Sequence, residues 1–567
     1  MEPTPNTAPR QLVLLCDGTN NNLTGRRNDT NLVKLAELLA ASPDPQRLLC
    51  YDPGVGNPGE LPGATTWDQL QRRLERIGGL AFGRGVFENM AESYLFLMRN
   101  YRPGDQIYIF GFSRGAFTAR SVAGLINLFG ILPAQLESMV PTLLHVYFSS
   151  RDDDGAWQAI AAQVLRVFGS APQRPNVHFI GVWDTVASVG MPPFGARFTA
   201  LPQPENKRYL HIRQALALDE HRSQFEPRLY ARNNGPFTTA DGSTGSLVQL
   251  WFPGAHCDVG GAYLPAESVL SDNALAWLAS EAVGEGLRLQ AEGAPLDNEP
   301  AVHRALAQVL QQDDGTRQAQ AHSELLDTPL WALTGLTVRD TTQVHLDDGG
   351  VVPLQAVAHQ PAGGAPAVAP PRRLKGGALV LLLTFVLVPL LMVLHGTRLL
   401  GLPLGSLSEV WDALRQAGPA LQANADFQSW QLFGWWTGLG PGNLRSAWGA
   451  LGWDLVLIAA YAYALSWWVS SAFARLVGWR CAGDGARLII TVLGWALPLA
   501  VGSDLAENLV TAALLASLKL GWWALAAVLQ WVLPLLSLAK FIGLAGALVL
   551  VVAGLLRPWR PRPAGLG

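Results

Sequence analysis

The sequence predicts an α/β fold, in which a mostly parallel sheet carries helices on both faces, followed by a C-terminal helical transmembrane region. Before about residue 360, short apolar segments alternate with segments whose apolar residues recur at helical spacing. This alternation is typical of a parallel sheet whose strands are connected by helices. After that point come uncharged apolar runs that are long enough to cross a bilayer.

The overall composition agrees with this division. Hydrophobic residues make up 49% of the 567 residues and charged residues 15%, whereas about a quarter of the residues in a soluble protein are charged. The net charge of −3 gives no electrostatic reason to expect a nucleic-acid partner. The four cysteines include no Cys-x-x-Cys pair, so we expect neither a disulfide framework nor a zinc ribbon. The apolar run at residues 12–16 is too short for a signal-peptide core.

The strands and helices of the α/β part follow from the periodicity of its apolar residues. Short apolar runs bounded by turn residues predict strands. These are residues 12–15, 48–51, 106–110, 177–183 and 247–252, with two late strands at 337–346 and 351–354. Apolar residues at helical spacing predict helices. These are residues 32–39, 85–100, 115–128 and 211–221.

We expect the chain to divide into four parts. They are an α/β domain at 1–354, an Ala/Pro/Gly-rich linker at 355–375, a transmembrane region at 376–557 and a basic, Pro-rich tail at 558–567. The transmembrane region holds two clear apolar runs and three that are short or adjoin one another, so we expect four or five spans. The runs are residues 376–394, 450–472, 488–501, 522–538 and 541–556.

Basic residues give the expected orientation. With an even number of spans, three basic clusters lie on one side of the membrane, and cationic loops favour the cytoplasmic side. The simplest arrangement is four spans in a bacterial inner membrane, with the α/β domain in the cytoplasm. The clusters are Arg372, Arg373 and Lys375, then Arg475, Arg480 and Arg487, and finally Arg557, Arg560 and Arg562.

The most informative segment is an apolar strand that leads directly into Gly-x-Ser-x-Gly, formed by Gly111, Ser113 and Gly115, and then into a helix-like run of small residues. A strand, this motif and a helix in this order predict the nucleophile elbow of an α/β-hydrolase-like sheet. The turn imposes unusual backbone angles on the serine, so the flanking positions must be nearly free of side chain. The alternative is an ordinary strand–helix turn with a capping serine.

A catalytic serine needs a base to take its proton and a carboxylate to orient that base. Asp184 follows the expected strand at 177–183, and His256 lies in a Gly-rich loop after the strand at 247–252. Ser113, Asp184 and His256 therefore occur in the order nucleophile, acid, base, which is the order in α/β-hydrolases. Taken singly, Asp184 also fits a turn or cap, and His256 also fits a structural loop residue.

Two backbone N–H groups are expected to stabilise the oxyanion that forms on a carbonyl carbon under attack. The amide of Arg114 directly follows the serine. The polar loop after the first strand offers the amide of Gly18 or Thr19. A plain turn at Asp17-Gly18 explains this loop equally well.

The sequence does not favour a cofactor. Asp17, His256 and Asp258 are potential metal ligands, but their spacing matches no particular metal site. The loop at residues 51–57 has neither the Gly-x-Gly-x-x-Gly nor the Walker pattern of nucleotide-binding loops. We therefore expect no metal and no other cofactor.

Five motifs occur in order along the chain: Cys16-Asp17-Gly18-Thr19, Gly111-Phe112-Ser113-Arg114-Gly115-Ala116, Val182-Trp183-Asp184-Thr185-Val186, Ala215-Leu216-Ala217-Leu218-Asp219-Glu220 and Trp251-Phe252-Pro253-Gly254-Ala255-His256-Cys257-Asp258-Val259-Gly260-Gly261. Together they resemble the DUF2235 α/β-hydrolases, a family that includes the Tle1-like phospholipase effectors of type VI secretion. The resemblance covers about residues 10–285. It implies esterase or phospholipase A activity and a triad of Ser113, Asp184 and His256. Cys257 departs from the family pattern, where a serine is expected.

Three functional hypotheses follow. The first is a membrane-anchored serine esterase that hydrolyses carboxylic esters of membrane lipids. The second is an antibacterial effector delivered to the membrane or periplasm of a target cell, with an immunity protein and a secretion-spike protein as partners. The third is a membrane scaffold or transporter with an inactive hydrolase-like domain. In that case Asp504 and Glu507, between apolar runs, mark an ion path, although carboxylates in a soluble loop explain them as well.

Overall fold

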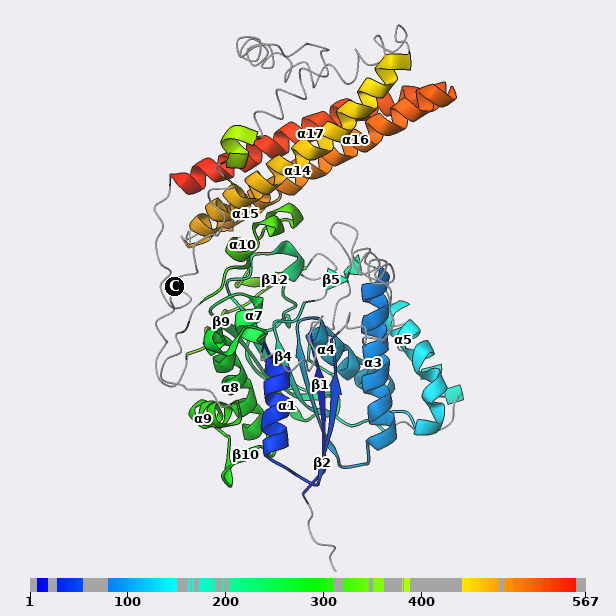
Figure 1. Cartoon of the computed structure of the whole chain (residues 1–567). Coiled ribbons are helices and arrows are strands. Elements are labelled where there is room, and N and C mark those ends of the chain that lie inside the picture. Colours follow the sequence, from blue (N-terminus) through cyan, green and yellow to red (C-terminus); the bar gives the residue numbers. More distant parts are fainter. Residues whose placement is uncertain are drawn as a thin grey trace, which may run out of the picture.

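A seven-stranded sheet forms the centre of the N-terminal part, and long C-terminal helices lie beside it (Figure 1). The mostly parallel sheet with its covering helices, and the apolar helices that follow, confirm the expected fold class. This computed structural model describes residues 8–18, 28–54, 80–149, 162–163, 166–167, 173–186, 188–189, 196–197, 203–310, 319, 321–345, 350–360, 380, 382–387, 441–478 and 484–556.

The sheet has the strand order β2-β1-β3-β4-β7-β9-β8 and is parallel except for β8 at one edge. Because β3, β4, β7 and β9 are parallel neighbours, the loops that follow them open at the same edge of the sheet. The strands are β1 (Gln11–Cys16), β2 (Arg47–Asp52), β3 (Gln106–Phe112), β4 (Val177–Trp183), β7 (Tyr209–Ala217), β8 (Gly235–Thr238) and β9 (Thr244–Phe252).

Helices cover both faces of the sheet and define two apolar cores. Successive side chains of β3 alternate between them, as the period of a strand requires. Ile107 and Ile109 face the core of α3, α4 and α5, whereas Tyr108 and Phe110 face the core of α1, α8 and α9. The helices are α1 (Asn31–Ala41), α3 (Leu80–Asn100), α4 (Arg114–Phe129), α5 (Val140–Ser149), α8 (Val269–Gly284) and α9 (Glu299–Val309).

The expected helix at residues 211–221 is wrong, because most of this segment belongs to strand β7. Two polar residues interrupt its apolar run and produced a helix-like spacing. Arg213 is buried and pairs with Glu281 and Glu285 beside α8. Gln214 is fully buried and accepts a hydrogen bond from Thr185 Oγ1 at 3.2 Å. These partners lie far away in the sequence, so the local pattern could not reveal them.

The late strands form a small hairpin of β12 (Gln343–His345) and β13 (Val351–Pro353). The expected strand at 337–346 was therefore too long at its start. The first residues of the expected linker pack against β9. The N–H of Trp251 donates to the carbonyl of Val357 at 2.9 Å, and the ring of His359 stacks on Phe252.

Among the described residues, three helical segments are long and apolar enough to cross a membrane, namely Asp454–Val477, Ala486–Ser517 and Ala524–Leu555. The two expected runs at 522–538 and 541–556 are one continuous helix. The expected run at 376–394 lies outside the described residues, apart from 380 and 382–387. The helices are α14 (Pro441–Gly478), α15 (Asp484–Gly494), α16 (Ala496–Leu520) and α17 (Trp523–Leu555).

A buried polar cluster joins these helices. Asp504 and Glu507 lie inside α16 rather than in a soluble loop, so the loop interpretation is wrong. Lys540 of α17 lies between them, with its Nζ 2.9 Å from Asp504 Oδ1 and 2.7 Å from Glu507 Oε2. Tyr461 of α14 donates its hydroxyl to Asp504 at 2.6 Å, and Ser537 of α17 donates to Glu507 at 3.0 Å. The carboxylates therefore hold three helices together.

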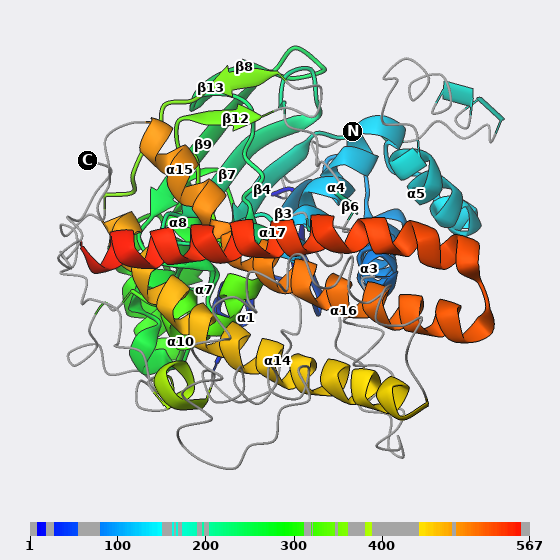
Figure 2. The same ribbon diagram turned by 90° about the horizontal axis from the view of Figure 1, so that it is seen from above.

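The helices rest on the α/β part through a segment that we call the strap, residues 323–340. It includes α10 (Glu324–Asp327) and the 3-10 helix η4 (Pro329–Thr334). Leu325, Ala332 and Leu336 of the strap pack with Phe473 of α14 and Leu497 of α16. Seen from above, α14, α16 and α17 cross over the α/β part as one layer (Figure 2).

Asp52, at the end of β2, is a buried carboxyl group whose ionisation should make the stability of the protein depend on pH. Burial raises the pKa of this carboxyl to about 7, and the charge of Glu92 adds to the effect. The folded protein therefore loses stability as the pH rises from about 4 to 7, because Asp52 must ionise while it is buried. We expect Asp52→Asn to raise the free energy of unfolding by about 1–3 kcal/mol at pH 8 and by less at pH 4.

Thermal unfolding in detergent, followed by tryptophan fluorescence between pH 4 and 8, measures this effect. Asp44→Asn is the matched control. Burial, the largest single effect, opposes ionisation of Asp44, but the hydrogen bonds from Arg288 and the backbone of Gln46, together with the nearby positive charges, outweigh it and lower the pKa. Asp44→Asn should therefore destabilise the protein at pH 8. A stability gain for Asp52→Asn that did not grow with pH would contradict the assignment.

Candidate active site

Ser113 lies in a sharp turn between β3 and α4. Its backbone angles are φ +58° and ψ −123°, which an L-residue adopts only under strain. The turn is fixed to the next strand, because the N–H of Ser113 donates to the carbonyl of Trp183 at 3.0 Å. The N–H of Val186 donates back to the carbonyl of Ser113 at 3.3 Å. Ser113 is thereby held beside the end of β4, where Asp184 follows.

The two glycines of the motif allow neighbouring backbones to approach closely. A Cβ on Gly115 would lie 2.1 Å from the carbonyl oxygen of Cys16 and 2.3 Å from that of Asp17. A Cβ on Gly111 would lie 2.5 Å from the carbonyl oxygen of Gly115. Each contact is with backbone, which cannot move aside easily. The motif therefore needs glycine at position 115 to pack α4 against the end of β1, and glycine at position 111 to let β3 turn back against the start of α4.

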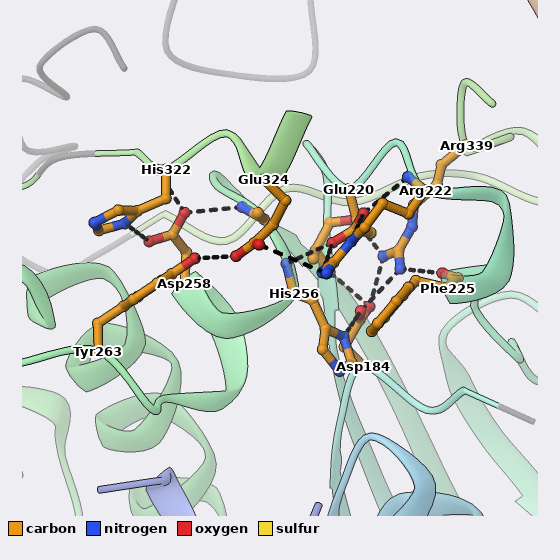
Figure 3. Close-up of polar contacts among 12 residues, drawn as sticks. Asp184, Glu220, Arg222, Phe225, His256, Asp258, Tyr263, His322, Glu324 and Arg339 are labelled. Carbon is orange, nitrogen blue, oxygen red and sulfur yellow. Dashed lines mark hydrogen bonds and ion pairs between the residues drawn. The ribbon is translucent and has the colours of Figure 1, made fainter. Parts of the chain in front are cut away.

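Asp184 and His256 meet at the same edge of the sheet (Figure 3). Asp184 follows β4 with φ +41° and is fully buried. His256 begins the short helix α7 (His256–Gly260) after β9, and its Nδ1 lies 2.5 Å from Asp184 Oδ2. The backbone N–H of Ala217, at the end of β7, donates to Asp184 Oδ1 at 2.9 Å. Three neighbouring strands thus bring together Asp184, His256 and a backbone donor.

The imidazole of His256 is fixed in orientation. Its ring lies 4.7 Å from that of Phe112 and 4.9 Å from that of Phe225, centroid to centroid. With Nδ1 bonded to a carboxylate, the ring carries its proton there and leaves Nε2 as the basic nitrogen. Nε2 is buried and has no hydrogen-bond partner among the described residues. Ser113 Oγ is therefore not bonded to it in this structure, and such contacts often tighten only when substrate binds.

Arg339 of the strap completes the surroundings of Asp184. Its guanidinium donates from one nitrogen to Asp184 Oδ1 at 2.6 Å and from the other to Oδ2 at 2.8 Å. Burial alone would raise the pKa of Asp184, but the charge of Arg339 and the hydrogen bonds from His256 and Arg339 hold it well below its usual range. Asp184 is therefore ionised at neutral pH.

A second buried ion pair lies on the other side of His256. Glu220 accepts from the backbone N–H of His256 at 3.3 Å and pairs with Arg222 at 2.7 Å. Burial would raise the pKa of Glu220, but the hydrogen bond and charge of Arg222 lower it to about 2. The guanidinium of Arg222 also lies over the ring of Phe225, 3.7 Å from its centroid. Two carboxylates and two guanidinium groups thus surround the imidazole.

The remaining candidates lie in separate clusters. Asp258 accepts from His322 Nδ1 at 2.7 Å, on the far side of α7 from Asp184 (Figure 3). Asp17 accepts from the hydroxyls of Thr30 and Tyr51 at 2.9 and 2.7 Å. Within the described ranges, no group of three side chains is arranged to hold a metal ion.

The N–H groups that were expected to bind the oxyanion differ in whether they already donate a hydrogen bond. The N–H of Gly18 donates to Asp17 Oδ1 at 2.6 Å, so it is already engaged. Thr19 lies outside the described residues. The N–H of Arg114 stands at the first position of a 16-residue helix, where the backbone groups favour negative charge.

Sequence reasoning missed Arg339 altogether. It lies outside every motif, and a single arginine 155 residues after Asp184 gives no local signal. Glu220 was visible only as part of one family motif, and the importance of Arg222 and Phe225 was not seen. These residues become part of the site only through tertiary contacts.

The comparison with known families agrees with this geometry. The catalytic domain of the type VI secretion phospholipase effectors, Tle1-like, matches residues 10–281. Over this range, a little under half of its length, the chain is similar to the Tle1-like catalytic domain. The match includes Ser113, Asp184 and His256 and ends before the strap. This part of the chain is therefore similar to a phospholipase catalytic domain.

A curated relative comes from Saccharomyces cerevisiae and is described as an uncharacterised protein. It is 31% identical over 237 residues, which is 40% of this chain and 33% of the yeast protein. The match thus spans about a third of the yeast protein's length. The likeness carries no assignment of substrate.

The elbow geometry predicts the effect of Gly115→Ala. The added methyl group would collide with the backbone at the end of β1, so the elbow must shift. We expect labelling of the chain by a serine-reactive fluorophosphonate to fall at least about tenfold. The matched control is Gly284→Ala on α8, where a Cβ meets nothing within 4 Å. Equal labelling of both variants would contradict the elbow.

Proposed function

We propose that this protein is a membrane-anchored serine esterase, of the phospholipase A type, which hydrolyses carboxylic esters of membrane lipids through an acyl-enzyme. The observation that carries the proposal is the bond between His256 and Asp184, which leaves Nε2 unpartnered at the sheet edge where Ser113 sits in a strained turn. The family match supplies the substrate class, because the domain matched is that of phospholipase effectors.

The mechanism follows from these positions. Ser113 Oγ attacks the ester carbonyl carbon while His256 Nε2 takes the hydroxyl proton. Asp184 keeps the Nδ1 proton in place and stabilises the imidazolium. The N–H of Arg114, at the start of α4, stabilises the oxyanion. Because the N–H of Gly18 donates to Asp17, the second donor in this proposal is the N–H of Thr19.

The intermediate then collapses. The C–O bond of the leaving alcohol breaks, and His256 returns the proton to the alcohol oxygen. Water, activated by the same imidazole, attacks the acyl-enzyme. The ester bond to Ser113 breaks, the fatty acid leaves and the serine recovers its proton.

The C-terminal helices support a location in the membrane. Large apolar side chains of α15, α16 and α17 are exposed along their length, which a bilayer would cover. Leu509 is 73% exposed and Leu535 is 67% exposed. The helices also lie beside the edge of the sheet that holds the site, so lipid would be close to the nucleophile.

The proposed orientation places the α/β domain in the cytoplasm of a bacterial cell. The end of α14 carries Arg475 and the start of α15 carries Arg487, and both ends lie on the side of the strap. Cationic ends favour the cytoplasmic side. This proposal also includes four membrane spans and a division of the chain into four parts, at residues 1–354, 355–375, 376–557 and 558–567.

A second candidate function is that of an antibacterial effector, delivered to the membrane or periplasm of a target cell. The observation that favours it is the family itself, whose description is that of type VI secretion effectors. An immunity protein and a secretion-spike protein would then be partners. Expression of the chain in a susceptible cell, with the polypeptide directed to the cytoplasm or to the periplasm, separates the two. Cell lysis by the periplasm-directed polypeptide alone would support the effector function.

Ser113→Ala tests the proposed chemistry. Removing the nucleophile should lower ester hydrolysis by at least about 10⁴-fold and abolish fluorophosphonate labelling. Purified protein in phospholipid vesicles, assayed for release of fatty acid, measures the effect.

The matched control is Ser280→Ala. Ser280 is a buried serine on α8 that donates to the carbonyl of Trp277 and lies outside the site. It should leave hydrolysis within about twofold of the unmodified protein. Hydrolysis that survived Ser113→Ala would remove the mechanism. A membrane phenotype left unaltered by Ser113→Ala would favour the scaffold or transporter hypothesis.

A further inference from the structure

We propose that Arg339 is a positioning residue for the acid of this site and that the strap connects it to helix α15, so that the membrane helices hold the catalytic geometry in place. The inference rests on the proposed function. It gives the C-terminal region a role beyond anchoring, because the family match ends at residue 281 and leaves Arg339 outside.

Arg339 is fixed on the side of the active site by a set of buried acceptors. Besides Asp184, its guanidinium donates to the carbonyl of Ala217 at 2.6 Å and to that of Phe225 at 2.5 Å. The side chain is 1% exposed. The carbonyl of Ala217 is at the end of β7. The carbonyl of Phe225 belongs to the residue whose ring packs on His256. A single guanidinium therefore fixes the carboxylate, the end of a strand and the neighbour of the base.

The next residue of the strap faces the membrane helices. Asp340 binds Arg487 of α15 through two parallel bonds, each of 2.7 Å. Such paired contacts restrict geometry more strongly than a single bond. Arg339 thus binds Asp184 in the active site, and the next residue, Asp340, binds α15. A displacement of α15 along its axis must move the backbone of the strap at Arg339 or break this pair.

Further contacts fix the strap to α15. The N–H of Leu336 donates to the carbonyl of Gly494 at 3.2 Å, and that of Val338 donates to Thr491 Oγ1 at 3.4 Å. A Cβ on Gly335 would lie 2.9 Å from the ring of Trp495, so the two segments are in tight contact. The strap is therefore not a free loop.

The strap is bonded to the α/β part as well. The N–H of Thr337 donates to the carbonyl of His221 at 2.8 Å, and that of Ser223 donates to the carbonyl of Gly335 at 3.1 Å. Trp331 packs edge-on against Phe225, which in turn packs on His256. The strap thus contacts the site through both its backbone and its side chains.

The other face of α15 explains why this connection concerns the bilayer. Leu488, Ile489 and Val492 are each more than 60% exposed, on a helix whose opposite side contacts the strap. Exposed apolar side chains at this spacing form a face that lipid would cover. In the bilayer, α15 is held by lipid on one side and holds the strap on the other.

Arg339→Met tests the first half of the inference, in full-length protein in phospholipid vesicles. Burial, no longer opposed by the guanidinium, should raise the pKa of Asp184 and keep it protonated to a higher pH. We expect kcat to fall by roughly 10- to 100-fold with KM little changed, and the acid limb of the pH–rate profile to move to higher pH. Arg339→Lys, which keeps the charge, should restore part of the rate and of the profile.

Arg487→Ala tests the second half. Breaking the pair with Asp340 should lower kcat by roughly 3- to 30-fold and speed amide hydrogen exchange of Leu336 and Thr337. Arg487→Lys should recover most of both. Arg475→Ala is the matched control, because it removes a cation from the end of α14 without touching Asp340. It should leave the rate and the exchange unchanged.

Fluorophosphonate labelling distinguishes a failure of this inference from a failure of the proposed function. Labelling that depends on Ser113, together with normal rates in Arg339→Met and Arg487→Ala, would overturn this inference and leave the proposed function standing. An unmodified protein that neither labels nor hydrolyses lipid would overturn both. A lower rate in Arg487→Ala without faster exchange in the strap would also overturn the connection.

Discussion

The buried carboxylate of Asp184 sets the constraint on which the site depends. A fully buried negative charge is tolerated only when hydrogen bonds and opposite charge replace its hydration. Here the backbone at the end of β7, the imidazole of His256 and the guanidinium of Arg339 supply that replacement. Each comes from a different stretch of the chain, so satisfying one charge brings four segments to a single point.

The parallel sheet makes this convergence possible. Neighbouring parallel strands end at one edge, and the loops after β3, β4 and β9 place Ser113, Asp184 and His256 there. Close backbone contacts then fix the exact placing of the elbow. The strap and the C-terminal helices lie over the same edge.

The sequence predicted those parts of the fold and site that have a local pattern. The elbow segment combines an apolar strand, two glycines and a helix within a short stretch, and the expected acid and base directly follow strands. Strand β7 was mistaken for a helix because buried Arg213 and Gln214 broke its apolar run, and their partners are distant. Arg339 had no signal for the same reason. The runs at 522–538 and 541–556 were predicted as separate, yet Lys540 between them lies inside α17, where Asp504 and Glu507 satisfy its charge.

The pairing of Lys540 with Asp504 and Glu507 has a consequence for the synthesis of the protein. A helix with two unneutralised carboxylates is costly to place in hydrocarbon, and so is one with a solitary ammonium group. The opposite charges lie on successive helices, so neither helix reaches a favourable state before its neighbour has left the ribosome. If the helices span a bilayer, as the proposed function has it, we therefore expect α16 and α17 to enter the lipid together as a hairpin.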